Sequence, residues 1–330
     1  MMSYDVVVGD YYGEQIYRLG DGDTSVRILP GLGFNCLGFE TSGVELIYGP
    51  PDLSALKERP SGFGIPILFP FPNRIEKGQF TFNGTSVQLD VPDTAPHSIH
   101  GFVLNRKWEV FDSGESERGG AWVSGRIRSQ DSAEVTRQWP FPFELTATYR
   151  LKDGVLMLEI EGTNVGIHKM PAGLGTHPYF PLPMKKNSKR DDCRLKVSAD
   201  SYWPLREDCI PTGERTEVKG KFDLRSPMSI GRETFDDVWT DVLSKDGWSD
   251  CEYEDPSAGT RIRIEADSTF REWVTYAPSD QPVVCFEPYT CTTDAVNLDT
   301  REIDGGLVSL APGESLVGSV RISLLEGTAS

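Results

Sequence analysis

The sequence predicts an all-β protein, built as a sandwich or a barrel with few short helices. Apolar and polar residues alternate with a period of two along much of the chain, which is typical of strands with one buried face. Two such runs are interrupted by Asn83-Gly84 and Asp153-Gly154, dipeptides that strongly predict a tight β-hairpin. Strands do not alternate with long helices, which argues against a doubly wound parallel sheet.

The expected elements follow one another at intervals of roughly 8 to 12 residues, as in sandwiches and barrels. The two hairpins span residues 79–89 and 149–160, and further strands are expected at residues 25–29, 44–48, 107–111, 122–127, 261–265, 273–276, 283–286 and 315–324. Helical periodicity is weak and predicts short helices only, at residues 52–58 and 132–138. The polar segment 184–192 is the most loop-like part of the chain, and it is too short to separate two domains. We therefore expect residues 1–330 to form one extended domain.

Composition and charge exclude several classes of partner. The chain holds 33 Lys and Arg against 50 Asp and Glu, a net charge of −17 at pH 7. A surface this negative repels phosphate backbones and anionic lipids, so we expect no nucleic-acid partner and no membrane partner. No run approaches the ~18 apolar residues of a membrane span, and no signal peptide is visible. Six scattered cysteines without a CxxC pair indicate reduced thiols, so the chain is expected to be cytoplasmic, as a monomer or a homodimer.

Histidine is scarce, and three of the four histidines lie in two unusual motifs. These motifs are Pro96-His97-Ser-Ile-His100-Gly-Phe102 and Gly173-Leu-Gly-Thr-His177-Pro-Tyr-Phe180. The three histidines could supply metal ligands, but no cysteine lies near them in sequence and there is no HExxH motif, so we expect no metal site. The chain also has no GxSxG elbow, no P-loop and no GxGxxG motif after a strand, so no cofactor is expected. The role of His97 is left open.

His177 is well placed to transfer protons. The following Pro178 restricts the backbone of His177 to the extended region, so the imidazole is presented from a stiff segment. An imidazole titrates near neutrality and can serve as an acid or as a base. Tyr179 and Phe180 supply rings of the kind that line sugar pockets. The alternative is a core histidine that is hydrogen-bonded beside an aromatic cluster.

Glu287 is the most informative carboxylate. It closes the apolar run Val283-Val-Cys-Phe286, in which strand alternation puts apolar side chains on both faces. Burial disfavours the charged form, so the pKa of Glu287 should be raised and its carboxylate should be a stronger base. An ion-paired carboxylate at the rim of the fold is the alternative.

Three further polar residues could hold a ligand that is rich in hydroxyl groups. Arg74 and Asn73 lie in the proline-stiffened segment Phe69-Pro-Phe-Pro-Asn-Arg-Ile75 and offer several hydrogen-bond donors. Asp236, in an aromatic-flanked segment, could accept hydrogen bonds from two adjacent hydroxyls. Its neighbour Asp237 makes that choice ambiguous, and both a turn-capping aspartate and a structural Arg74 are alternatives.

Together these motifs resemble the aldose 1-epimerase family, which includes the galactose mutarotases. The resemblance runs from about residue 60 to 325, and each motif is short, whereas their joint order is specific. The matching motifs are Asn73-Arg-Ile75, His100-Gly-Phe102, Trp139-Pro-Phe-Pro-Phe-Glu-Leu145, Tyr149-Arg-Leu151, His177-Pro-Tyr-Phe180, Phe235-Asp236 with Trp239, Glu287-Pro288 and Leu310-Ala-Pro-Gly-Glu314.

The resemblance implies a large antiparallel β-sandwich, the mutarotase-like supersandwich, whose concave face binds a pyranose. It implies a cofactor-independent isomerase that interconverts the α and β anomers of a hexose. In this assignment His177 is the general acid that protonates the ring oxygen, and Glu287 is the general base that takes the proton of the C1 hydroxyl. Arg74, His100 and Asp236, with Asn73 beside them, are implied to bind the sugar.

The substrate and some rival functions are left open. Residues 64–70 resemble a wider subgroup that contains hexose-6-phosphate 1-epimerases, and the residues before His100 depart from the commoner pattern. A phosphorylated sugar would need two or three converging cations, for which Arg74, Arg106 and Arg271 are available. With a net charge of −17, a neutral hexose is the simpler substrate. A non-catalytic carbohydrate-binding protein on the same scaffold, a protein-interaction module, and a glycosidase with Glu287 and Asp236 as its carboxylates are the alternatives.

Overall fold

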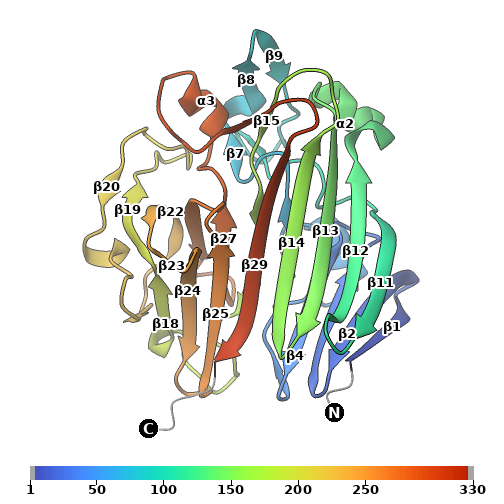
Figure 1. The fold of residues 1–330 in the computed structure, drawn as a ribbon. Coiled ribbons are helices and arrows are strands. Elements are labelled where there is room, and N and C mark those ends of the chain that lie inside the picture. Colours follow the sequence, from blue (N-terminus) through green and yellow to red (C-terminus); the bar gives the residue numbers. More distant parts are fainter. Residues whose placement is uncertain (1–3, 326–330) are drawn as a thin grey trace.

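The computed structural model describes residues 4–325 as a layered arrangement of antiparallel strands (Figure 1). The largest sheet has ten strands, and its core order along the sheet is β11 (Glu109–Ser116), β12 (Gly120–Arg128), β13 (Phe143–Lys152), β14 (Val155–Asn164), β29 (Ser315–Leu325), β25 (Thr260–Asp267), β24 (Trp248–Asp255), β18 (Arg194–Val197) and β21 (Met228–Ser229). The short β23 (Ser244–Lys245) also pairs with β24. This confirms the predicted all-β class, and the antiparallel layers agree with the sandwich that the resemblance implied.

The second sheet carries the face on which the site lies. Its order is β20 (Thr216–Glu217), β19 (Ala199–Trp203), β22 (Phe235–Val242), β26 (Glu272–Ala277), β27 (Val283–Tyr289), β16 (Gly175–Thr176) and β6 (Ile67–Leu68), and β17 (Tyr179–Pro181) pairs with β27. A third sheet holds the N-terminal strands β1 (Tyr4–Tyr11), β2 (Glu14–Asp21), β3 (Thr24–Leu29), β4 (Asn35–Thr41) and β5 (Val44–Glu45).

Smaller elements complete the described part of the chain. Three two-stranded ladders pair β7 (Arg74–Ile75) with β10 (Ser98–Ile99), β8 (Gln79–Phe82) with β9 (Thr85–Gln88), and β15 (Met170–Ala172) with β28 (Val308–Leu310). The α-helices are α1 (Leu53–Glu58), α2 (Ala133–Gln138) and α3 (Ala295–Asp299). Asp52 and Ser132 cap α1 and α2, because their side chains accept hydrogen bonds from the backbone N–H groups of Ala55 and Val135. None of the helices within residues 4–325 has the length and apolar character needed to cross a membrane.

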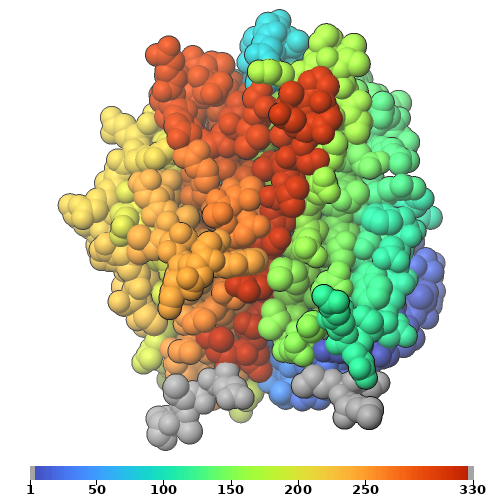
Figure 2. All heavy atoms as spheres, viewed as in Figure 1, coloured from blue at the N-terminus to red at the C-terminus, as the bar shows by residue number. Residues whose placement is uncertain are grey.

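The last strand, β29, closes the large sheet. It pairs with β14 on one side and with β25 on the other, so it joins strands that lie about a hundred residues apart in the sequence. Figure 2 shows it as a red band that runs between the green and orange strands without a break in the packed surface. One continuous apolar core draws side chains from all three large sheets, among them Val26, Leu145 and Phe286.

Glycines on the inner face of the large sheet leave room for aromatic rings that support the site. A Cβ atom at Gly162 of β14 would lie 2.5 Å from the ring of Phe69, which packs edge-on against Phe143 at 5.0 Å between ring centroids. The segment that begins at Phe69 is therefore fixed against the sheet. The backbone carbonyl of Phe69 accepts a hydrogen bond of 2.9 Å from the backbone N–H of Phe102, two residues after His100.

The local predictions vary in accuracy. Both predicted hairpins are present, and the positive φ angles at Asn83, Gly84, Asp153 and Gly154 are those of type I′ turns. The strand expected at residues 44–48 is wrong beyond Glu45, because the backbone N–H of Tyr48 bonds to the carbonyl of Tyr179 instead of a neighbouring strand of its own sheet. The strand expected at 107–111 begins only at Glu109 and continues to Ser116.

Several elements were not predicted from the sequence, among them β1, β2, β4, β18, β19, β22, β24 and α3. The segment 184–192, expected to be a loop, connects β17 to β18 and contains a single short 3-10 turn. All six cysteines are free, and five of them are buried.

Glu272 gives the fold a predictable response to pH. This buried carboxyl on β26 accepts hydrogen bonds from Trp203 Nε1 at 3.1 Å and Thr240 Oγ1 at 3.2 Å, and burial raises its pKa from 4.5 to about 8. The folded state therefore holds a proton that the unfolded chain loses near pH 4.5, and stability is lost as the pH rises from about 4.5 through 8.

We expect Glu272→Gln, which cannot ionise, to gain several degrees of unfolding temperature relative to the wild type as the pH rises from 5 to 9. Thermal unfolding followed by circular dichroism at pH 5, 7 and 9 measures this difference. A difference between the two proteins that stays constant with pH would contradict a buried, protonated Glu272.

Candidate active site

All six residues singled out from the sequence line one pocket. It has a cavity volume of about 210 Å³ and is lined by Arg59, Ser61, Asn73, Arg74, Ile99, His100, His177, Tyr179, Asp236, Tyr276 and Glu287. Drug-sized ligands occupy roughly 300–1,000 Å³. The pocket therefore has the size for a single sugar ring.

Strand register places the carboxylates on one face of the second sheet. Asp236 of β22 lies opposite Tyr276 of β26, which lies opposite Cys285 of β27, two residues before Glu287. Side chains two residues apart on a strand share a face. The intervening residues, such as Phe286, point the other way into the main core, so β27 carries the site on one face and packs with the other.

Glu287 and His177 meet inside this pocket. Glu287 Oε1 lies 3.3 Å from His177 Nε2, and the two residues are only 2% and 6% exposed. The backbone N–H of His177 donates a hydrogen bond of 2.9 Å to the carbonyl of Pro66, and its ring stacks on Tyr179 at 4.5 Å between centroids. The imidazole is thus held from two sides with Nε2 directed at the glutamate.

Burial shifts the pKa values of this pair in opposite directions. Desolvation lowers the pKa of His177 to about 3. It raises the pKa of Glu287 well above 4.5, against the lowering effect of the hydrogen bond from the Tyr289 hydroxyl. Both shifts favour the uncharged forms. A neutral imidazole and a protonated carboxyl are therefore the favoured forms of this pair.

The short two-stranded ladder of β7 and β10 places three of the other residues in the pocket. In the β7–β10 ladder Arg74 lies opposite Ile99, and the backbone N–H of His100 donates a hydrogen bond of 2.9 Å to the carbonyl of Asn73. The Arg74 guanidinium donates to Asn73 Oδ1 at 2.9 Å and lies 3.5 Å from Asp236 Oδ2. His100 is 7% exposed, and its Nδ1 has no hydrogen-bond partner among residues 4–325.

The structure distinguishes the two adjacent aspartates. Asp236 lines the pocket, whereas Asp237 is not among the lining residues, as expected for neighbours on a strand. Asp237 lies 3.8 Å from Lys221 Nζ, and burial raises its pKa above 3.8.

His97 lies outside the pocket lining and contacts residues of two loops. Its Nδ1 accepts a hydrogen bond of 3.1 Å from the backbone N–H of Lys77, which leaves the proton of the neutral ring on Nε2. Nε2 lies 3.4 Å from Asp208 Oδ2. The next residue, Cys209, has its sulfur 3.6 Å from Asp236 Oδ2. His97 does not line the pocket; it lies between the β7–β10 ladder that carries Arg74 and the loop whose Cys209 contacts Asp236, and its Nε2 makes no hydrogen bond within residues 4–325.

The sequence analysis missed Arg59, Ser61 and Tyr276 as pocket residues, and it did not name Tyr289 as a partner of Glu287. Tyr289 could have been found, because it lies two residues after Glu287 and shares its face of the strand. No local signal marks the other three, since distant elements bring them to the pocket.

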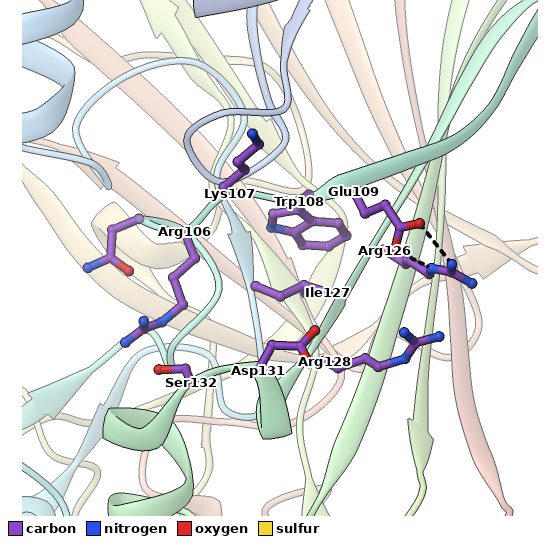
Figure 3. Close-up of a pocket in the computed structure, with 10 residues that line it drawn as sticks. Arg106, Lys107, Trp108, Glu109, Arg126, Ile127, Arg128, Asp131 and Ser132 are labelled. Atoms are coloured by element: carbon purple, nitrogen blue, oxygen red, sulfur yellow. Dashed lines mark hydrogen bonds and ion pairs between the residues drawn. The ribbon is translucent and has the colours of Figure 1, made fainter.

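A larger pocket contains none of the candidate catalytic residues. It has a volume of about 520 Å³ and lies between β11, β12 and the start of α2, over Trp108 and Ile127 (Figure 3). Three of its cations are each paired with a carboxylate: Arg106 with Glu134, Arg126 with Glu109, and Arg128 with Glu144. Arg106, considered above as a possible phosphate ligand, therefore belongs to this pocket and not to the one with His177.

Comparison with known proteins identifies the family. The sequence profile described as aldose 1-epimerase matches residues 15–323. The chain belongs to the aldose 1-epimerase family. The galactose mutarotase of Homo sapiens is 27% identical over 193 residues, which cover 58% of this chain and 54% of that protein. The Escherichia coli K12 protein YphB is 23% identical over 274 residues, covering 77% of this chain and 81% of YphB.

Solved structures share the fold of this aldose 1-epimerase family member. A galactose mutarotase-like protein from Clostridium acetobutylicum aligns with a TM-score of 0.89 at 23% identity, over 98% of this chain and 99% of that chain. A galactose 1-epimerase from Lactobacillus acidophilus aligns with a TM-score of 0.78 at 17% identity, over 99% and 100%. The alignment with the human relative spans only about half of that protein's length.

Gly101 offers a test of how the loop that follows β10 is held in place. Its φ is +69°, and an added Cβ would lie 2.1 Å from the carbonyl oxygen of Phe69. Gly84 has a similar φ of +79° but open space around it. We expect Gly84→Ala to cost about 1 kcal/mol of unfolding free energy through backbone strain alone.

Gly101→Ala should cost more than about 2 kcal/mol, because the backbone of Phe69 must also move. Urea unfolding of the two variants beside the wild type measures both costs. Equal losses would show that Phe69 does not constrain the loop.

Proposed function

We propose that this protein is an aldose 1-epimerase that interconverts the α and β anomers of a hexopyranose by acid-base catalysis. The observation that supports this best is the buried contact between His177 and Glu287, at 3.3 Å, in a pocket of the size of one sugar ring. Anomer exchange requires that the C1 hydroxyl lose a proton while the ring oxygen gains one. Both oxygens are bonded to C1, so two groups this close together can serve both.

In the proposed reaction, Glu287 takes the proton of the C1 hydroxyl while His177 donates a proton to the ring oxygen. The C1–ring oxygen bond breaks, and the free aldehyde rotates about the C1–C2 bond. On closure from the other face, His177 takes the proton of the C5 hydroxyl and Glu287 returns one to the new C1 hydroxyl. The roles reverse between opening and closure, so the protein ends in its starting state and no cofactor is consumed.

The favoured protonation states of His177 and Glu287 fit this scheme. The favoured uncharged forms of His177 and Glu287 together carry the one proton that the reaction needs. Moving it from Glu287 to His177 creates the reactive carboxylate and imidazolium. Burial disfavours these charged forms. Sugar hydroxyls that donate hydrogen bonds to Glu287 would stabilise its carboxylate. Arg74, Asn73, His100 and Asp236 are proposed to hold the remaining hydroxyls and so orient the ring.

The rival functions account less well for this geometry. A carbohydrate-binding protein without catalysis does not need a buried imidazole against a buried carboxylate. A glycosidase needs two carboxyl groups that flank a glycosidic bond, whereas here Glu287 contacts His177 and Asp236 lies 3.5 Å from the Arg74 guanidinium.

The decisive variants are His177→Asn and Glu287→Gln. Each should lower kcat for anomer exchange by about 10²–10⁴-fold, because an acid or base is removed while the size of the side chain changes little. Polarimetry and NMR exchange between the anomers of glucose and galactose measure the rates. The exposed His168→Asn and Glu161→Gln are matched controls that should exchange anomers at the wild-type rate. Near-normal turnover in either site variant would refute the role given to that residue.

The pH profile of kcat/KM should be broad. When Glu287 already holds a proton, His177 takes up a second one only as the pH falls towards its pKa of about 3. Activity should therefore hold down to about pH 4. At high pH the pair loses its proton, and because the pKa of Glu287 is raised, this loss occurs far above 4.5. Rates from pH 3.5 to 10, corrected for the spontaneous reaction, measure both limbs. An acid limb centred near pH 6.5 would contradict the buried pair.

A further inference from the structure

A second arginine reaches the pocket from a distant element. Arg59 ends helix α1 and lines the same cavity as His177 and Glu287. Its guanidinium donates a hydrogen bond of 3.2 Å to Oε1 of Gln281, a neutral side chain 222 positions away. Arg59 is exposed, and within residues 4–325 its guanidinium makes no ion pair with a carboxylate.

The other arginines considered for the substrate are compensated. Arg74 lies 3.5 Å from Asp236, Arg106 lies in the other pocket, and Arg271 makes two hydrogen bonds to Asp304, at 3.0 and 2.8 Å. Arg59 and Arg74 are the cationic side chains among the lining residues of the described chain. The pocket thus has one unpaired positive charge, in a protein with a net charge of −17.

The two arginines serve different parts of the pocket. The charge of Arg74 lowers the pKa of His177 and of Glu287, at the reacting pair. The charge of Arg59 instead lowers the pKa of the Tyr179 and Tyr276 hydroxyls. Burial and nearby carboxylates raise these pKa values more strongly, Glu287 for Tyr179 and Asp236 and Asp280 for Tyr276. Gln281 donates a hydrogen bond of 3.4 Å to the Tyr276 hydroxyl, and Ser61 lines the cavity beside Arg59. We call Arg59, Ser61, Tyr276 and Gln281 the outer edge of the pocket.

We propose that the outer edge binds a carboxylate on the aldose, so that hexuronic acids are preferred to neutral hexoses and to hexose phosphates. This rests on the proposed function, whose sugar site it refines. A planar guanidinium matches a carboxylate with two parallel hydrogen bonds, which are about twice as strong as bonds between neutral groups. One unpaired cation balances one negative charge, whereas a phosphate group carries about −1.5 to −2 at pH 7.

Binding can be tested without turnover, because methyl glycosides cannot open their rings. Isothermal titration calorimetry compares methyl β-glucuronide with methyl β-glucoside, which differ only at C6. We expect the wild type to bind the glucuronide about tenfold or more tightly. Arg59→Gln should lose that preference. The control Arg118→Gln changes an exposed arginine in the β11–β12 turn, which is far from the lining residues in sequence and belongs to neither pocket, and should keep it.

Equal affinity for the two glycosides, or a preference that survives Arg59→Gln, would overturn the proposal. Tighter binding of glucose 6-phosphate than of the glucuronide would overturn it in favour of a phosphate. Anomer exchange of glucuronate, glucose and galactose is measured on the same samples. If no sugar is turned over while the glucuronide preference persists, the proposed activity fails and the carboxylate site stands.

Discussion

The site depends on a carboxylate that is buried inside a strand. Glu287 lies in β27, all of whose residues are buried, and the backbone ladders to β26 and β17 fix its position. Burial disfavours its charged form, and the groups that act on its proton are His177, the Tyr289 hydroxyl and, at longer range, Arg74 and Asp236. The surrounding fold keeps Glu287 and His177 buried and fixed in position.

Two kinds of support achieve that rigidity. The second sheet carries its reactive side chains on one face and anchors the other face in the main core, so the strands that carry the site cannot shift without disturbing that core. The β7–β10 segment that carries Arg74 and His100 has separate contacts. The ring of Phe69 packs against Gly162, and His97 lies between Lys77 and Asp208. The acid-base pair and the sugar-binding groups thus belong to independently braced elements that meet at the pocket.

What the sequence predicts follows the range of the underlying interactions. The Asn83-Gly84 and Asp153-Gly154 hairpins are decided by a few adjacent residues, and both form as predicted. The insertion of β29 between β14 and β25 depends on pairing across the whole chain, which no local pattern records. The proximity of His177 and Glu287 came from resemblance to a family, not from spacing. Arg59 was missed because only the folded chain brings it to Gln281.

The proposed mechanism requires that His177 and Glu287 share one proton at a buried site, and the charge state of His177 reports this most directly. Two-dimensional NMR of ¹⁵N-labelled protein gives the protonation of each imidazole nitrogen as a function of pH. We expect His177 to stay neutral down to about pH 4 in protein without added sugar, and we compare it with the exposed His168 in the same sample. A His177 ring that becomes cationic near pH 6.5 would show that burial does not lower its pKa and would refute the shared proton.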